Sequence, residues 1–334
     1  MSRQKVLKLL KSRPADHISG EEIAQKLGLS RAAVWKAVDA LRREGYTVEA
    51  RTGLGYRLTG VADALSEAEI RGFLGETEIV GRELTCLDTV DSTNTYLKRR
   101  AMAGAAEGLV VTADCQTGGR GRMERVFQNP AGKMVALSVL LRPTVPLERL
   151  TSITAQVAVA LCDAIEEVCG LRPQIKWTND LVLNRKKLCG ILTEMALEGE
   201  TGQLQYLVTG MGINVHQTKA DFSGEVAQMA TSLDMELGIQ VSRPRLAAAE
   251  LRALDRLYGD IRRNDVGRYL EAYRRDCVTL GKPVQLISAD GTRETAQALD
   301  IDDDFGLRVR LADGSGRTVR TGEVSVRGMY GYVD

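Results

Sequence analysis

The first 60 residues combine three short helical patterns with an alternating stretch, an order that admits few folds. Apolar side chains form a helical stripe over 3–13. A Ser-Gly-Glu-Glu capping signal at 19–22 opens a second short helix, and Gly28-Leu29 turns the chain into a third over 31–44. Residues 46–58 then alternate around a Gly-Leu-Gly turn, as a two-stranded hairpin does. Two helices joined by a tight glycine turn and followed by a hairpin predict a winged helix-turn-helix domain.

Charge separates the same segment from the rest of the chain. Residues 1–60 hold 12 Lys and Arg against 6 Asp and Glu, whereas the remaining residues hold 33 against 38. A basic head on a mildly acidic body suits a polyanion such as DNA. A helical hairpin used for dimerisation is the alternative that this pattern leaves open. In the third helix the apolar stripe faces inward, so the residues predicted to contact DNA are those at its exposed start: Ser30, Arg31, Trp35 and Lys36.

The remaining residues predict an α+β body, because strand and helix patterns alternate and 334 residues exceed what one core usually holds. The strands are expected at 109–114, 134–141, 173–177, 188–198 and 204–214. The helices are expected near 94–104, 148–169 and 243–280. From Pro283 onward, short strands between glycine turns predict a small β-barrel. The predicted domains are therefore a winged head over 1–62, a central mixed α/β-sheet domain over 63–281 and a small barrel over 282–334.

Composition excludes several classes of protein. The longest apolar runs are too short to span a bilayer, and lysines interrupt the N-terminal apolar positions, so neither a membrane segment nor a secretory signal is expected. The six cysteines are dispersed without a Cys-x-x-Cys pair, which favours buried free thiols in a cytosolic protein. With two histidines, a His-based metal cluster is not expected, and no metal-ligating residue is predicted.

A glycine-rich cationic loop over 116–127 bears the strongest chemical signal of the body. It follows a predicted strand and places three arginines within six residues. Glycines let backbone amides approach a ligand closely, and the arginines suit phosphate or carboxylate. The loop is neither a Walker A motif nor a Gly-x-Gly-x-x-Gly turn opening a helix. A solvated basic loop, or a second nucleic-acid contact, remains the alternative.

Two further polar segments support a ligand site. Residues 91–94, Asp-Ser-Thr-Asn, lie at a helix start, where they cap the helix or bind a small polar ligand. In the Lys-Trp-Thr-Asn-Asp segment at 176–180, Lys176 lies beside apolar residues on a strand expected to be buried, and a buried ammonium needs an anionic partner. A strand-edge lysine with its head in water is the alternative.

In order, the segments DSTNTYL, GGRGR, KWTND, LCGILTEM and GMGIN, between a winged helix and a small barrel, closely resemble the bifunctional biotin protein ligase and biotin operon repressor family. The resemblance covers nearly the whole chain. It implies a central ligase domain followed by an SH3-like barrel. It implies condensation of biotin with ATP to biotinyl-5′-AMP and transfer of biotin to a lysine of a biotin carboxyl carrier protein. It also implies a homodimer that, with adenylate bound, binds operator DNA and represses biotin genes.

The resemblance also assigns site residues. The residues implied to be catalytic are Lys176, Arg120 and Arg122. Those implied to bind biotin are Ser92, Thr93, Asn94, Gln116, Arg120, Gly121, Arg122 and Lys176. Those implied to bind the adenylate are Gly119, Arg125, Phe127 and Asn179. Because two anions must meet, fixed cations serve this chemistry better than a general base. Mg²⁺ would share the triphosphate charge, mainly through water and phosphate oxygens.

The chain departs from the family pattern at three places. Met123-Glu124 interrupt the loop where the family has a small or basic residue and glycine, which lowers the charge of the loop. Phe127 replaces a tryptophan, so stacking on adenine is expected with less area. Thr178 replaces a proline. Three other functions compete with the bifunctional one: a lipoate ligase, a biotin-sensing repressor without ligase activity, and an active ligase whose head no longer represses.

Overall fold

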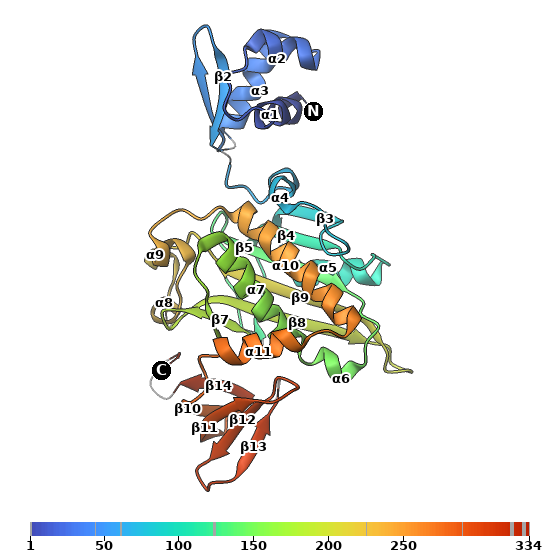
Figure 1. The fold of residues 1–334 in the computed structure, drawn as a ribbon, viewed down its shortest axis with the longest axis vertical. Helices are drawn as coiled ribbons and strands as arrows, with labels where there is room; N and C mark the ends of the chain where they lie inside the picture. The colour runs from blue at the N-terminus through green and yellow to red at the C-terminus, as the bar shows by residue number, and fades with distance from the viewer. Residues whose placement is uncertain are drawn as a thin grey trace. The chain divides into compact units, whose positions relative to one another are not determined.

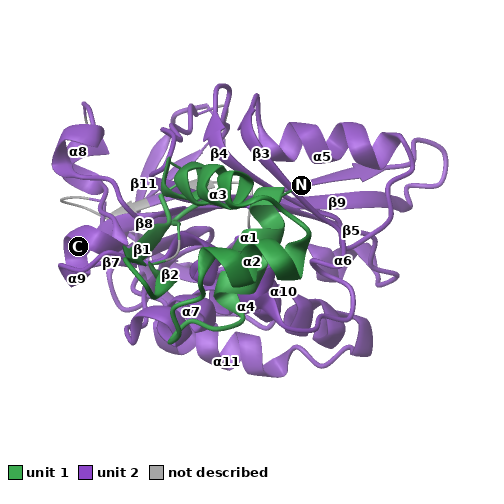
Figure 2. Ribbon diagram, turned by 90° about the horizontal axis from the view of Figure 1, so that it is seen from above, with its two compact units in different colours: residues 1–64 green, residues 65–334 purple. Residues whose placement is uncertain are grey.

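The computed structural model describes residues 2–43, 45–60, 62–122, 125–224, 226–288, 290–320, 324–328 and 332–333, and of strand β14 only the side chain of Val326. Its contacts divide the chain into two compact units, residues 1–64 and 65–334, which Figure 2 shows in green and purple. The boundaries at 62 and 281 for three domains stay a prediction.

The first unit contains three helices and a two-stranded hairpin. The helices are α1 (Ser2–Lys11), α2 (Gly20–Leu27) and α3 (Arg31–Arg43), and the strands are β1 (Thr47–Arg51) and β2 (Gly55–Gly60), paired antiparallel. The apolar stripes of all three helices meet in one small core with residues of the hairpin. The order of elements predicted for residues 1–60 is confirmed.

Local signals set the ends of α2 and the position of the hairpin. The Ser19 hydroxyl accepts a hydrogen bond from the Glu22 amide at 3.0 Å, and Gly28 ends the helix in the left-handed conformation with φ 65°. Ile18 and Tyr56 exchange two backbone hydrogen bonds. At Gly55, a Cβ atom would lie 2.2 Å from the Ile18 carbonyl oxygen, so this close approach requires glycine.

The second unit is built on a seven-stranded sheet with the strand order β3-β4-β5-β9-β8-β7-β6. The strands are β3 (Leu84–Val90), β4 (Val110–Gln116), β5 (Met134–Leu141), β6 (Gln174–Lys176), β7 (Asp180–Leu183), β8 (Lys186–Leu197) and β9 (Leu204–Asn214). Only the edge pair β3–β4 is parallel; every other pair in this sheet is antiparallel. The sheet is therefore mixed, as predicted.

Helices cover the two faces of this sheet unequally. Helices α7 (Ile153–Cys169), α10 (Arg243–Arg263) and α11 (Gly267–Asp276) lie on one face, and α5 (Thr93–Met102) lies on the other (Figure 2). The shorter helices are α4 (Glu67–Leu74), α6 (Leu147–Leu150), α8 (Val226–Met229) and α9 (Leu233–Leu237), with a 3₁₀ turn at Lys219–Asp221. The larger core lies under α7 and α10, and a smaller cluster lies under α5. Next to α5, part of this face of the sheet lines a pocket.

The last strands form a second sheet, and its β11–β12 turn contacts the β6–β7 turn and α11 (Gly267–Asp276). Its antiparallel strands are β10 (Pro283–Ser288), β11 (Arg293–Ile301), β12 (Leu307–Leu311), β13 (Gly316–Val319) and β14 (Val324–Gly328), in the order β13-β12-β11-β10-β14 (Figure 1). The Trp177 indole donates a hydrogen bond to the Phe305 carbonyl at 3.0 Å, and the rings of Phe305 and Tyr273 meet edge to face at 5.5 Å. The predicted small β unit is thus confirmed as a five-stranded antiparallel sheet.

Some boundaries within the body differ from the prediction. Strands β3 and β7 were not expected: β3 is half exposed and β7 has four residues, so neither shows a clear pattern. The helix expected over 148–169 is interrupted after Leu150, and the one expected over 243–280 is interrupted at Asn264, which adopts φ 61°.

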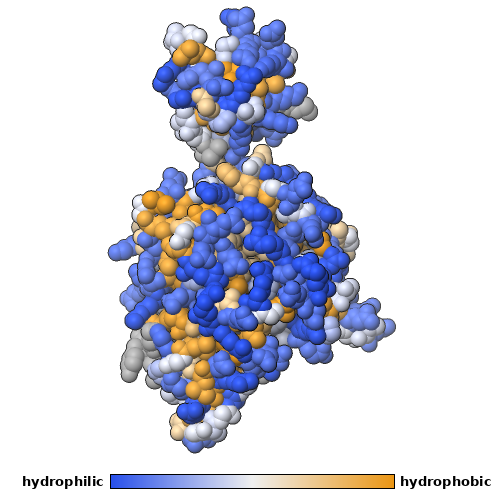
Figure 3. All heavy atoms as spheres, viewed as in Figure 1, coloured by the Kyte–Doolittle hydropathy of each residue, from blue (hydrophilic) through white to orange (hydrophobic). Residues whose placement is uncertain are grey.

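Among the described residues, no helix combines the length and the apolar character needed to cross a bilayer. The face seen in Figure 3 is mostly hydrophilic, with smaller hydrophobic areas between.

Candidate active site

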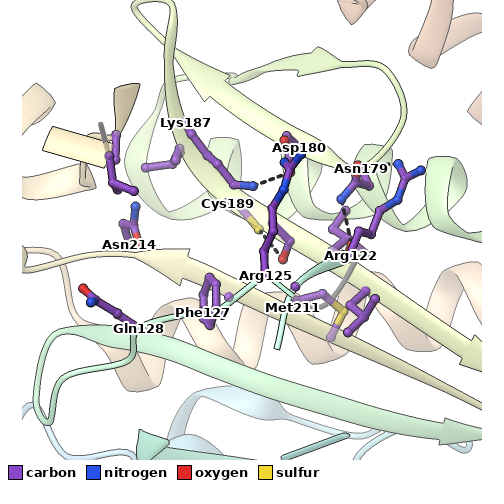
Figure 4. A pocket seen from close by; sticks show the side chains of 18 of the residues that line it. Arg122, Arg125, Phe127, Gln128, Asn179, Asp180, Lys187, Cys189, Met211 and Asn214 are labelled. Carbon is purple, nitrogen blue, oxygen red and sulfur yellow. Dashed lines mark hydrogen bonds and ion pairs between the residues drawn. The ribbon is translucent and has the colours of Figure 1, made fainter. Parts of the chain in front are cut away.

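A cavity of about 460 Å³ opens on the side of the large sheet that α5 leaves uncovered. Its walls come from the start of α5, the loop after β4, the β6–β7 turn, the middle of β8 and β9, and the segment around α8; Figure 4 shows part of it. Eleven of the twelve residues predicted for biotin and adenylate line this one cavity: Ser92, Thr93, Asn94, Gln116, Arg120, Gly121, Arg122, Arg125, Phe127, Lys176 and Asn179.

Gly119 is the predicted residue that does not line the cavity. It is buried behind Phe127: its carbonyl accepts a hydrogen bond from the Phe127 amide at 2.9 Å. A Cβ at Gly119 would lie 2.3 Å from the Phe127 carbonyl oxygen. Gly119 therefore allows the two arms of the loop to pack closely, because a side chain at this position would collide with Phe127.

Polar groups gather at the end of the cavity nearest α5. The Ser92 hydroxyl accepts from the Thr95 amide and caps the helix, as its position predicted. The Gln116 carboxamide oxygen accepts from the Thr93 amide at 2.9 Å and lies 3.1 Å from the Thr93 hydroxyl. Thr93 and Asn94 are both almost fully buried. The cavity thus ends in hydroxyl and amide groups, which recognise a neutral polar ligand.

Lys176 lies at the end of β6 with 7% of its surface exposed. Its ammonium is 3.4 Å from the ring centroid of Tyr332, a cation–π contact, and the Tyr332 hydroxyl donates to the Asp180 carboxylate. Lys187 also pairs with Asp180, at 2.7 Å (Figure 4). Burial alone would raise the pKa of the Asp180 carboxyl, but Lys187, Lys176 and the Tyr332 hydroxyl outweigh it and lower that pKa below its usual value.

The cationic loop crosses the cavity and is tied to the β6–β7 turn. The Arg122 guanidinium donates to the Thr178 hydroxyl at 3.1 Å and to the Asn179 side-chain oxygen at 3.0 Å (Figure 4). Burial lowers the pKa of Arg122 from its usual value. Arg120 and Arg125, in contrast, are exposed. The departure noted at Met123-Glu124 lies outside the described residues.

Phe127 forms a flat apolar surface against β9. A Cβ atom at Gly212 would lie 2.3 Å from Phe127 Cζ, so the ring rests directly on the glycine backbone. Gly210, two residues earlier, leaves equivalent room for the Asn94 amide, whose oxygen would lie 2.1 Å from a Cβ there. The glycines of the Gly-Met-Gly segment thus make space for one polar and one aromatic side chain of the cavity.

Pattern reasoning missed several cavity residues. The side chains of Asp180 on β7 and Lys187 on β8 pair at 2.7 Å, and Tyr332 follows β14. Ser138 lies behind the cavity within the apolar run of β5 and is fully buried. A lone serine in a buried strand was the available signal for Ser138. No sequence signal pointed to Tyr332, because its partners Lys176 and Asp180 are distant in the sequence.

The predicted DNA-contacting residues lie at the exposed start of α3. Ser30, Arg31, Trp35 and Lys36 are all exposed, Trp35 by 57%. The Ser30 hydroxyl accepts from the Ala33 amide at 3.2 Å, and Arg31 pairs with Glu21 at 2.5 Å. Whether they contact DNA stays a prediction.

Family profiles match three parts of the chain. The biotin/lipoate A/B protein ligase family matches residues 86–214, an HTH domain matches residues 2–57, and the biotin protein ligase C terminal domain matches residues 279–327. These three matches follow the order in which the winged head, the large sheet and the small sheet occur along the chain.

Similarity to individual proteins extends over the whole architecture. The bifunctional ligase/repressor BirA of Bacillus subtilis is 37% identical over 312 residues, which cover 93% of this chain and 95% of the relative. The chain belongs to the biotin protein ligase family. BirA of Escherichia coli is 30% identical over 81% of this chain and 82% of its own length. A biotin–[acetyl-CoA-carboxylase] ligase of Mycobacterium tuberculosis is 33% identical over 71% and 86%.

Solved biotin protein ligases share the fold. The enzyme of Aquifex aeolicus, in complex with biotin and ATP, superposes with a TM-score of 0.63, covering 74% of this chain and 99% of that one at 24% identity. The predicted family, fold class and enzyme class are therefore confirmed for this biotin protein ligase. The lipoate ligase alternative loses its basis, because the full-length relatives and the C-terminal domain are those of biotin ligases.

Proposed function

We propose that the cavity condenses biotin with ATP to biotinyl-5′-AMP and passes biotin to one lysine of a biotin carboxyl carrier protein. The observation that carries this assignment is the position of Lys176. This buried ammonium shares one cavity with a neutral polar end at Thr93 and Gln116 and with the arginine loop. The polar end at Thr93 and Gln116 suits an uncharged ring system, and the half that holds Lys176 and the arginine loop suits phosphates.

In the first step a carboxylate oxygen of biotin attacks the α-phosphorus of ATP, and pyrophosphate leaves. Both reactants are anions, so fixed cations placed at the developing negative charge lower the activation barrier. Lys176 is assigned to the reacting carboxylate and α-phosphate, with Arg120 and Arg122 closing over the product. Arg125 and Asn179 also line this half, and Phe127 offers a face for adenine.

In the second step the amine of the carrier lysine attacks the biotinyl carbonyl, the bond to AMP breaks, and the nitrogen loses a proton. Ser92, Thr93, Gln116 and Gly121 keep the biotin portion in place during both steps. Because the mixed anhydride reacts with any amine, retention by Arg122 and its partners on the β6–β7 turn is what confines transfer to the carrier.

Mg²⁺ is proposed to enter with the triphosphate, whose charge it neutralises. Among the described residues, no three His, Cys, Asp or Glu side chains gather as a metal cage. The carboxylates that line the cavity are already paired: Asp180 with Lys187 and Tyr332, and Asp221 with Lys133 and Thr218. Phosphate oxygens and water are therefore the proposed ligands of the ion.

We propose that the head represses biotin genes when the adenylate is bound, as a homodimer whose two recognition helices enter two half-sites of the operator. The basic charge of residues 1–60 and the exposed start of α3 support DNA binding. Such a protein acts in the cytosol, where DNA and ATP are available.

Pyrophosphate release tests the enzymatic part. The protein is incubated with biotin, ATP and Mg²⁺, and pyrophosphate is measured together with enzyme-bound biotinyl-5′-AMP. We expect one adenylate per active site and a matching burst of pyrophosphate. Tight biotin binding without pyrophosphate would instead identify a biotin-sensing repressor without ligase activity.

A further inference from the structure

The C-terminal part of the chain contacts the Lys-Trp-Thr-Asn-Asp segment at two points. At the first point, the Trp177 indole donates to the Phe305 carbonyl on the β11–β12 turn at 3.0 Å. At the second point, Tyr332 contacts both charged ends of the segment, Lys176 and Asp180. Because Tyr332 also lines the cavity, the segment that follows β14 contributes a side chain to the wall of the proposed active site.

The pairing of the strands brings the charges of this wall together. Lys176 and Asp180 are directly opposed across the β6–β7 hairpin, and directly opposed side chains lie on the same face of a sheet. From the neighbouring strand β8, the Lys187 ammonium donates to Oδ1 of Asp180 at 2.7 Å. One carboxylate is therefore bonded to one lysine and shares a face of the sheet with a second lysine.

Tyr332 contacts two of these charges through two different groups. Its hydroxyl donates to Oδ2 of Asp180, the oxygen that Lys187 does not use. Each oxygen of the carboxylate thus has its own donor, and the orientation of the carboxylate is fixed from both sides. The ring of Tyr332 lies against the Lys176 ammonium, 3.4 Å from centroid to Nζ, and the face of an aromatic ring attracts a cation.

We propose that Tyr332 is a positioning residue that fixes Asp180 and Lys176 for adenylate formation, so that the C-terminal segment completes the active site. Lys176 is 7% exposed, and a charge so little hydrated is held in place by protein groups. Precise placement matters because a shift of about 1 Å in a reacting geometry can cost roughly 100-fold in rate. This inference rests on the proposed function, which assigns Lys176 to the reacting carboxylate and α-phosphate.

Two substitutions separate the hydroxyl of Tyr332 from its ring. Tyr332→Phe keeps the ring over Lys176 and removes the donor to Asp180. It should slow adenylate formation on the order of 10-fold, because a hydrogen bond to a charged group is lost. Tyr332→Leu removes the ring as well and should be slower by about a further three-fold.

The test measures the rate and the affinity of the full chain separately. The rate is single-turnover pyrophosphate release with saturating biotin, ATP and Mg²⁺, and the affinity is the dissociation constant of biotin from calorimetry without ATP. In both variants the affinity should change by less than about three-fold, because an interaction that positions reacting groups lowers the rate more than binding. Val333→Ala, at the neighbouring residue outside the cavity lining, is the matched control and should match wild-type protein in both measurements.

The comparison of rate with affinity distinguishes positioning from a structural role. A merely structural loss would weaken biotin binding in step with the rate, and that result would overturn the proposal. If Tyr332→Leu does not fold, Tyr332→Phe gives the test alone, since it keeps the ring. Wild-type rates in the Tyr332 variants would refute this inference alone, whereas wild-type protein that releases no pyrophosphate would refute the proposed function as well.

Discussion

Gly212 and Phe127 are in direct contact: a Cβ atom on Gly212 would lie 2.3 Å from the tip of the Phe127 ring. A side chain at 212 and a ring in this position exclude each other, because real Cβ atoms do not approach so closely. The aromatic wall of the cavity therefore depends on a glycine 85 residues further along the chain.

Gly212→Ala should displace Phe127 and weaken ATP more than biotin. Loss of the stacking surface is expected to raise the KM for ATP roughly 2- to 10-fold, the worth of one aromatic pair. Steady-state pyrophosphate assays at varied ATP and at varied biotin would show this split. Gly199→Ala is the matched control, since nothing lies within 4 Å of a Cβ at Gly199. An equal rise in both KM values would contradict a specific role of Phe127 at the nucleotide.

Arg122→Gly should release the adenylate more than it slows its synthesis. The substitution removes two hydrogen bonds, to Thr178 and Asn179, that tie the loop to the β6–β7 turn. Leaked biotinyl-5′-AMP should biotinylate lysines of a bystander protein, detected by blotting with labelled streptavidin. Arg122→Lys keeps the charge without the paired geometry and should leak to an intermediate extent. Bystander labelling no greater than that of wild-type protein would remove Arg122 from the loop closure.

The arrangement of the cavity could be predicted from the sequence where short motifs supplied several polar groups together. Segments 91–94, 116–127 and 176–180 each placed predicted residues on the same cavity. Ser138 could not be found this way, because it is the one polar residue in the apolar run of β5 and its partner Asn94 lies 44 residues away in the sequence. The fold was predictable where apolar patterns were long, whereas β3 and β7 are too short or too exposed to show one.

Lys36→Ala should weaken operator binding and lower its dependence on salt. If Lys36 contacts a phosphate, the slope of log affinity against log salt should fall by about one. Fluorescence anisotropy with a duplex carrying the promoter of the biotin genes, at several salt concentrations, measures it. Lys26 serves as control, because it is already paired with Glu22 at 2.7 Å and its removal should change the slope less. Equal slopes for wild-type protein and Lys36→Ala would contradict a contact between Lys36 and a phosphate of the operator.

Glu250→Gln should stabilise the protein above neutral pH. Glu250 is fully buried on α10 with neither carboxyl oxygen bonded to a described residue, and this burial raises its pKa well above the usual value. Below the ordinary pKa both the folded and the unfolded state hold the proton. Above it only the unfolded state ionises, so the free energy of unfolding falls by about 1.4 kcal/mol per pH unit until the folded-state pKa is reached.

Thermal melts of Glu250→Gln from pH 5 to 9 would reveal this linkage. The variant should melt higher than wild-type protein at pH 8, by roughly 2–4 °C for each kcal/mol recovered, and the gain should shrink toward pH 5. Glu271→Gln, an exposed change on α11, should melt like wild-type protein throughout. A gain that is constant with pH would show that ionisation of Glu250 is not its cause.

Intact mass spectrometry of a carrier domain tests the central claim most directly. The full-length protein is incubated with biotin, ATP, Mg²⁺ and a biotin carboxyl carrier domain, in parallel with Lys176→Ala and with Lys186→Ala, a nearby lysine outside the cavity lining. We predict that wild-type protein and Lys186→Ala add the mass of one biotinyl group to one carrier lysine, while Lys176→Ala is slower on the order of 100- to 1000-fold. A carrier of unchanged mass with wild-type protein, or full activity of Lys176→Ala, would contradict the account.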